Sequence, residues 1–178
     1  MTITRREIEG MTEGNGTKPN QKAMTIIVTK GSLDWAYPPF ILATTAAAMG
    51  VNTTMFFTFY GLPLLLKKLD LKISPLGNPA MKMPMAGMHM GMPNWASAIP
   101  GVDSAATSMM KDMIKKKGVA SIEELRAMAL EADVKMIACQ MTMDLFEYKK
   151  EDMIDGLELG GAATYMEQAL KSGVNLFI

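Results

Sequence analysis

The chain has 178 residues, in which 18 basic and 18 acidic side chains balance, and it contains one cysteine. This length predicts a single domain with a substantial core, and the balanced charge excludes a strong field that would attract nucleic acid or an acidic partner. One cysteine excludes a disulfide-stapled secreted scaffold, and residues 1–10 lack the apolar segment of a secretory signal, so we expect a cytoplasmic protein.

The first quarter of the chain predicts a tail, a strand and a helix. Residues 1–22 are rich in glycine and polar side chains and predict a flexible tail. The β-branched, apolar segment Ala23–Thr29 predicts a buried strand, and the turn Lys30-Gly31-Ser32 follows it. Asp34 is the expected cap of a helix that runs to Met49 and that tolerates its prolines only in the first turn.

An uncharged stretch continues into a second strand and a short helix. Val51–Tyr60 is rich in Thr and Phe and predicts the strand, and Gly61–Leu69 predicts the helix. No charged residue occurs from Trp35 to Leu66, but proline, glycine and asparagine interrupt this stretch, whereas a membrane-spanning helix needs about 20 consecutive apolar residues. We therefore predict buried elements, with a membrane-attached form as the alternative.

The segment Asp70–Gly101 differs from the rest because it contains five prolines. This density predicts no regular element, so we interpret residues 74–101 as a long Met/Pro-rich loop or lid. Helical spacing returns over Val102–Lys117, and Ser121 and Glu124 form a capping box that starts the next helix.

The last quarter of the chain alternates strands with helices. Val134–Cys139, Ile154–Leu159 and Val174–Ile178 predict strands, which are separated by a short helical turn at Asp144–Lys149 and by a helix over 160–173. Several predicted strands are continuously apolar rather than alternating, which indicates a parallel sheet covered on both faces by helices. We predict an α/β fold with a mainly parallel sheet of about five strands, in one domain over 23–178.

Cys139 is the residue whose position points to chemistry. Ligands in open α/β sheets collect beyond the carboxyl ends of the strands, and backbone N–H groups at a following helix favour the reactive thiolate. We therefore expect Cys139 to present an ionised sulfur to an open pocket at the edge of the sheet, with Gln140 and Thr142 as further donors. The alternative is a buried cysteine that only fills space.

Two other segments invite a functional interpretation. Lys30-Gly31-Ser32 could hold an anion through backbone N–H groups, although it lacks the glycine spacing of a P-loop and a plain turn is the simpler interpretation. In the long loop, six methionines and His89 occur within residues 81–92. Thioethers suit Cu(I), but methionine is also an adaptable apolar residue, and its abundance here (20 in all) favours a lid over a metal site. The lid residues are Met81, Met83, Met85, Met88, His89 and Met90.

Short motifs also occur in a characteristic order along the chain. They are Ala36-Tyr37-Pro38-Pro39-Phe40, Gly77-Asn78-Pro79-Ala80-Met81-Lys82-Met83, Ala138-Cys139-Gln140-Met141-Thr142-Met143-Asp144, Ile154-Asp155-Gly156, Gly160-Gly161-Ala162 and Val174-Asn175-Leu176-Phe177-Ile178. Together they resemble the DsrE/DsrF-like (DsrEFH) sulfur-relay family, in particular its methionine-rich, DsrE-like branch, over about Ala23–Ile178.

This resemblance implies a three-layer α/β/α sandwich, a homo-oligomer, and a cysteine, here Cys139, that holds sulfane sulfur as a persulfide or thiosulfonate. It implies a sulfurtransferase-like carrier rather than a multiple-turnover enzyme, without a cofactor, that exchanges sulfur with a TusA-like carrier or a rhodanese-like donor. With one cysteine, the expected mechanism uses a single thiol. The alternative functions are a Cu(I)-binding protein that uses the Met-rich loop and a non-catalytic oligomeric subunit.

Overall fold

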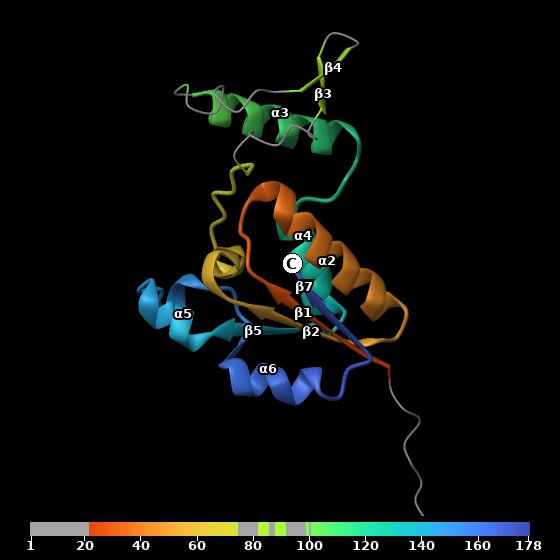
Figure 1. Ribbon diagram of the computed structural model, residues 1–178, viewed down its shortest axis with the longest axis vertical. Coiled ribbons are helices and arrows are strands. Elements are labelled where there is room, and N and C mark those ends of the chain that lie inside the picture. The colour runs from red at the N-terminus through yellow and green to blue at the C-terminus, as the bar shows by residue number, and fades with distance from the viewer. Residues whose placement is uncertain (1–21, 75–81, 86–87, 92–98, 100) are drawn as a thin grey trace, which may run out of the picture.

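A five-stranded sheet lies at the centre of the computed structural model, which describes residues 22–74, 82–85, 88–91, 99 and 101–178 (Figure 1). All of its strand pairs are parallel, in the order β6-β5-β2-β1-β7, so the predicted parallel sheet is confirmed. The strands are β1 (Ala23–Val28), β2 (Asn52–Phe57), β5 (Lys135–Cys139), β6 (Glu158–Gly160) and β7 (Val174–Phe177).

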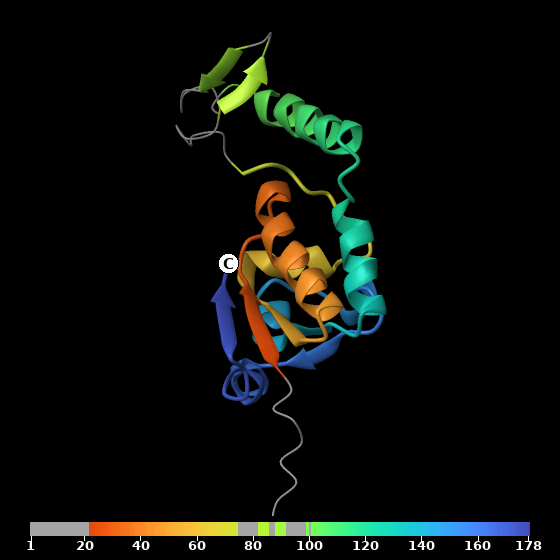
Figure 2. The same cartoon turned by 90° about the vertical axis from the view of Figure 1, so that its right-hand side faces the viewer.

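Helices cover both faces of this sheet. On one face, α2 (Leu33–Ala48) and α4 (Ile122–Glu131) pack against each other, and Figure 2 shows them side by side. On the other face lies α6 (Ala162–Ala169), while α5 (Gln140–Leu145) follows directly from the end of β5 (Figure 1). The predicted three-layer α/β/α architecture is therefore confirmed.

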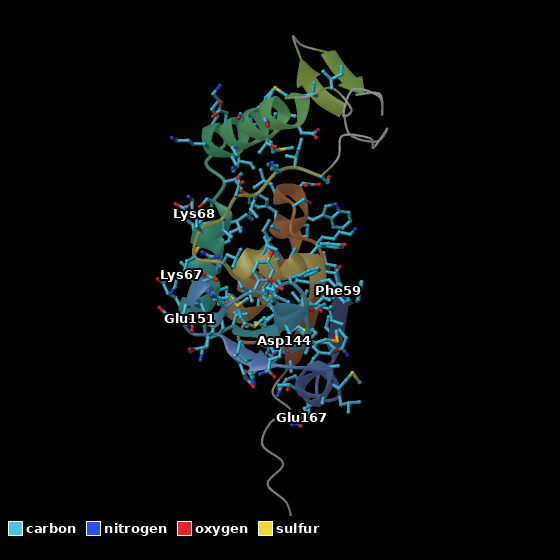
Figure 3. The ribbon with its side chains drawn as sticks, turned by 90° about the vertical axis from the view of Figure 1, so that its left-hand side faces the viewer. Phe59, Lys67, Lys68, Asp144, Glu151 and Glu167 are labelled. Carbon is cyan, nitrogen blue, oxygen red and sulfur yellow. The ribbon has the colours of Figure 1, made fainter. Side chains whose placement is uncertain are left out.

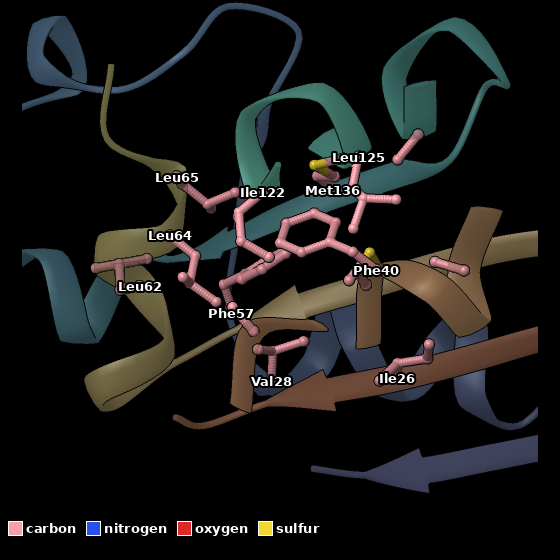
Figure 4. Packing of buried hydrophobic residues seen from close by; sticks show 14 of the residues in the cluster. Ile26, Val28, Phe40, Phe57, Leu62, Leu64, Leu65, Ile122, Leu125 and Met136 are labelled. Atoms are coloured by element: carbon pink, nitrogen blue, oxygen red, sulfur yellow. The ribbon is translucent and has the colours of Figure 1, made fainter. Parts of the chain in front are cut away.

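The main core lies between the sheet and the α2–α4 layer (Figure 4). Phe40 of α2 and Phe57 of β2 are both fully buried, with ring centroids 5.9 Å apart. The 3-10 helix η1 (Phe59–Leu65), which follows β2, adds fully buried leucines to this core (Figure 4). These are Leu62, Leu64 and Leu65. The uncharged stretch of the sequence is thus apolar because it forms the core.

Helix α2 departs from the prediction at its start. Ser32, not Asp34, is the N-cap residue, and the Asp34 carboxylate instead accepts hydrogen bonds from the backbone N–H (2.8 Å) and the hydroxyl (2.6 Å) of Ser74. Pro38 and Pro39 lie in the second turn rather than the first. The helix tolerates them because Pro39 and its apolar neighbours are buried, and tertiary packing outweighs local propensity.

The second strand ends three residues earlier than predicted. Phe59 adopts a left-handed conformation (φ 46°), which breaks the extended chain and starts η1 where an ordinary helix over 61–69 was expected. The buried guanidinium of Arg126 donates hydrogen bonds to the carbonyl oxygens of Leu64 (2.8 Å) and Leu66 (2.7 Å). These bonds satisfy carbonyl groups that the end of a short helix leaves without partners.

The prediction that no regular element occurs in 70–101 is wrong. β3 (Lys82–Met85) and β4 (Met88–Gly91) form an antiparallel pair in which Pro84 lies opposite His89. Met85 and Met88 are the last opposite residues of the two strands and form a hydrogen-bonded pair. Opposite residues alternate between hydrogen-bonded and non-hydrogen-bonded pairs, so Pro84 and His89 form a non-hydrogen-bonded pair, where a proline removes no hydrogen bond between the strands. The side chains of the predicted lid and Cu(I) ligands, and residues 1–21 of the predicted tail, lie outside the described residues. Helix α3 (Val102–Lys116) follows, as predicted.

Two further boundaries were misplaced. α5 begins at Gln140, directly after Cys139, rather than near Asp144, and β6 is confined to Glu158–Gly160. A short 3-10 helix, η3 (Lys150–Asp152), lies between them. Within the described parts of the chain, no helix has both the length and the apolar character needed to cross a membrane, and the stretch Trp35–Leu66 folds into α2, β2 and η1.

Candidate functional site

The candidate site centres on Cys139, the last residue of β5 and the N-cap residue of α5. Its position at the carboxyl end of a strand, followed at once by a helix, matches the expectation. Its burial does not, because the residue is only 4% exposed and packs with Phe56, Ile137 and Tyr165. Tyr165 of α6 lies over this strand end, with its ring centroid 5.4 Å from that of Phe56. The expectation that Cys139 faces an open pocket is therefore wrong.

Polar groups nevertheless favour ionisation of this buried sulfur. Burial raises the pKa of the Cys139 thiol, but the hydroxyl and backbone N–H of Thr142, the hydroxyl of Thr58 and the backbone N–H of Met141 together outweigh it, and the pKa lies below its usual value. Hydrogen bonds to an ionised acceptor are stronger than those to a neutral one, so these donors act chiefly on the charged form. The site therefore stabilises a thiolate in an otherwise apolar setting.

Thr142 links the two sides of the site. Its side chain is fully buried, and its hydroxyl oxygen lies 3.1 Å from that of Thr58, so that either hydroxyl can be the donor. The backbone N–H of Phe59 also donates to the Thr142 oxygen, at 3.2 Å. This second bond uses only acceptor capacity of the Thr142 oxygen, so when Thr58 donates to Thr142 the single proton of Thr142 is available for the sulfur.

Two glycines allow the segment that carries Thr58 to lie against the turn after β1. A Cβ atom on Gly61 would lie 2.2 Å from the carbonyl oxygen of Val28, and one on Gly31 would lie 2.1 Å from that of Tyr60. Real Cβ atoms do not approach a backbone oxygen so closely, so both positions require glycine. The backbone N–H of Thr58 also donates to the Val28 oxygen, at 3.1 Å.

The predicted site residues separate into two groups. Thr142 is brought to the sulfur, whereas the Gln140 side chain is exposed and the nearby backbone donor is that of Met141 instead. The Lys30 ammonium lies 3.2 Å from the ring centroid of Trp35, in a cation–π contact. Gly31 packs on η1 and Ser32 begins α2, so the turn positions other segments rather than contacting the thiol.

Thr58 and Phe59 were missed in the sequence. Thr58 follows the last residue of β2, which is the sheet neighbour of β5, so the rule that placed Cys139 at the carboxyl edge also applies to Thr58. No local pattern predicts the positive φ of Phe59, because bulky residues rarely adopt it.

We expect the ionised form of Cys139 to stabilise the fold more than its thiol form does. Its pKa is lowered in the folded chain, whereas an unfolded chain has the ordinary value of 9.0. The stabilisation is therefore fully present above the unfolded pKa and is lost as pH falls through the lowered, folded pKa. Urea titrations between about pH 6 and 10 should show the native chain gaining unfolding free energy relative to Cys139→Ser as pH rises. A difference that stays constant with pH would contradict this assignment.

Comparisons with known proteins agree with this architecture. The model of the DsrE/DsrF/DrsH-like family matches residues 20–177. The chain is 59% identical over 158 residues to the sulfur carrier protein DsrE2 of Allochromatium vinosum, with 89% of this chain and 99% of that protein covered. It is 35% identical over 165 residues to the uncharacterized protein YrkE of Bacillus subtilis, covering 88% and 97%.

A solved structure shares the fold. The crystal structure of the ychN protein from E. coli is 12% identical, with a TM-score of 0.53 over 89% of this chain and 99% of that chain. From the family match and the identity to these two relatives, the chain belongs to the DsrE/DsrF/DrsH-like family.

Proposed function

We propose that this protein is a sulfur carrier, which holds sulfane sulfur on Cys139 as a persulfide or thiosulfonate and passes it to a partner thiol. The observation that carries the proposal is a buried thiol whose ionised form is stabilised by two threonine hydroxyls and two backbone N–H groups. The 59% identity to a relative named as a sulfur carrier supports the same role.

The loading chemistry needs no oxidant or cofactor. With thiosulfate, the Cys139 thiolate attacks the sulfane sulfur, a new S–S bond forms, the bond to the sulfite sulfur breaks, and sulfite leaves with that bond's electron pair. With tetrathionate, the same attack leaves a Cys139 thiosulfonate and releases thiosulfate. Both steps are displacements at sulfur by a thiolate, so their rates follow the thiolate fraction and the access to the thiol.

The same donors suit the release of sulfur. When an acceptor thiolate attacks the outer sulfur of the persulfide, Cys139 leaves as a thiolate, and a leaving thiol of low pKa leaves faster. Thr142 and Thr58 therefore assist unloading as well as loading. The near-complete burial of the sulfur shields the adduct from water and from stray oxidants.

The location, assembly and partners of the carrier are also proposed. We propose a cytoplasmic carrier that acts stoichiometrically, assembles as a homo-oligomer, and exchanges sulfur with a TusA-like carrier or a rhodanese-like donor. Gln140, the turn at 30–32 and a lid over the adduct formed by the Met-rich segment 81–92 stay predictions.

The test is an intact-mass measurement after incubation with polysulfide, thiosulfate or tetrathionate. We expect the native chain to gain sulfur and Cys139→Ser to gain none. Because two methionine oxidations add nearly the mass of one sulfur atom and the chain has 20 methionines, half of each sample is treated with dithiothreitol, which removes a persulfide but leaves sulfoxides. An adduct that dithiothreitol removes from Cys139→Ser would disprove the assignment of the carrier residue.

A further inference from the structure

Five large apolar side chains are exposed where η1 meets α5. We call them together the aromatic rim, which consists of Phe59 (43% exposed), Tyr60 (72%), Met141 (62%), Leu145 (60%) and Phe146 (38%). The Phe146 ring stacks on that of Tyr60 at 6.0 Å and meets that of Phe59 edge-on at 6.5 Å. Phe59 and Asp144 mark the two segments in Figure 3.

The rim is continuous with the carrier site. Phe59 donates its backbone N–H to Thr142, and the backbone N–H of Met141 is one of the donors that favour the Cys139 thiolate. Phe59 is held in a left-handed conformation that is costly for a bulky residue, and strain of this kind is characteristic of functional sites. A sulfur acceptor that approaches Cys139 along this edge therefore meets the rim.

We propose that the aromatic rim is the docking surface for the sulfur-accepting protein, which presents a cysteine on an apolar surface. This inference rests on the proposed carrier function. Aromatic and methionine side chains are enriched in protein interfaces, and exposed apolar patches bordered by polar residues mark such interfaces. Among residues 58–66 and 140–146, Asp144 is the single charged residue, so the matching partner surface is apolar with a basic residue opposite Asp144.

The shape of the rim favours a protein over a small thiol. A small thiol is best held in a pocket, whereas the rim side chains are 38–72% exposed on the surface. A second copy of this chain is a poor acceptor, because its one cysteine, Cys139, is itself buried. A protein acceptor instead buries the rings and delivers its thiolate to the outer sulfur. The S–S bond then breaks, Cys139 leaves as a thiolate, and the persulfide is re-formed on the acceptor.

A protein acceptor and a small-molecule acceptor of sulfur distinguish an effect on docking from an effect on the reactivity of Cys139. The chain is loaded with thiosulfate, and transfer is followed to a TusA-like carrier protein and to reduced glutathione. Truncating an aromatic anchor of an interface commonly costs tenfold or more in affinity, so Tyr60→Ser and Phe146→Ser should each slow transfer to the protein about tenfold while changing transfer to glutathione less than about twofold. Phe177→Ser, which removes an exposed ring (74%) from β7 at the far side of the sheet, should change neither rate.

Each other outcome overturns the inference. Equal slowing with both acceptors would show that the rings act on the thiol itself, and unchanged transfer to the protein would show that the rim is not used. A native dimer in light scattering that both rim variants convert to monomers would assign the rim to a second copy. If the native chain takes up no sulfur, the proposed function fails as well, whereas normal uptake with an idle rim refutes this inference alone.

Discussion

A Thr58→Val, Thr142→Val double variant is expected to react with iodoacetamide about tenfold more slowly than the native chain at neutral pH. Hydrogen bonds to a charged group contribute about 1.5–3 kcal/mol, so losing both hydroxyls should lower the thiolate fraction at a given pH by about a hundredfold. Because a thiol of higher pKa is more nucleophilic once ionised, roughly tenfold of that loss is recovered. The pH profile of alkylation should also move to higher pH, since these hydroxyls lower the pKa of Cys139.

Two variants control this experiment. Thr142→Ser keeps the hydroxyl and should retain the native rate, whereas Thr44→Val removes a hydroxyl that bonds the Phe40 carbonyl on α2 and should have no effect. A general loosening of the fold would expose the buried sulfur and make alkylation faster, so slower alkylation cannot arise from loosening. A double variant that reacts at the native rate would show that the hydroxyls do not act on the sulfur.

Gly61→Ala is expected to destabilise the fold by about 3 kcal/mol, at the upper end of what overpacking usually costs. The new Cβ would lie 2.2 Å from the Val28 oxygen and 2.7 Å from its carbonyl carbon, so the backbone of η1 has to move away from β1. For a chain of this size the midpoint of thermal unfolding should fall by about 6–12 °C. Because Thr58 precedes η1, the same shift should weaken its contribution to the thiolate.

Gly173→Ala is the matched control for this change. A Cβ at Gly173 has no neighbour within 4 Å, so its unfolding free energy should stay within about 1 kcal/mol of the native value. Calorimetry or circular dichroism on both variants provides the comparison. Equal stability of the Gly61 and Gly173 variants would mean that the contact between η1 and β1 is not tight.

The sequence was sufficient to predict those elements that depend on local patterns of residues. Ser121 and Glu124 predict a capping box, and both of its hydrogen bonds are present, at 2.7 Å and 3.2 Å. The apolar run that ends at Cys139 predicts a central strand, and β5 occupies it. Periodicity, capping and continuous apolar runs are properties of neighbours in the chain, so they could be recognised without knowing the fold.

The sequence alone therefore determined the α/β class, the order of most elements and the position of the single thiol at the end of a strand. Only the tertiary structure decided how that thiol is surrounded. Thr58 and Thr142 are 84 residues apart in the chain, and they meet because β2 and β5 are neighbours in the sheet. Burial beneath α6 and the exposed rings between η1 and α5 arise in the same way, from contacts between distant segments. Such contacts depend on strand order and on the close approach of backbones, which no local spacing encodes.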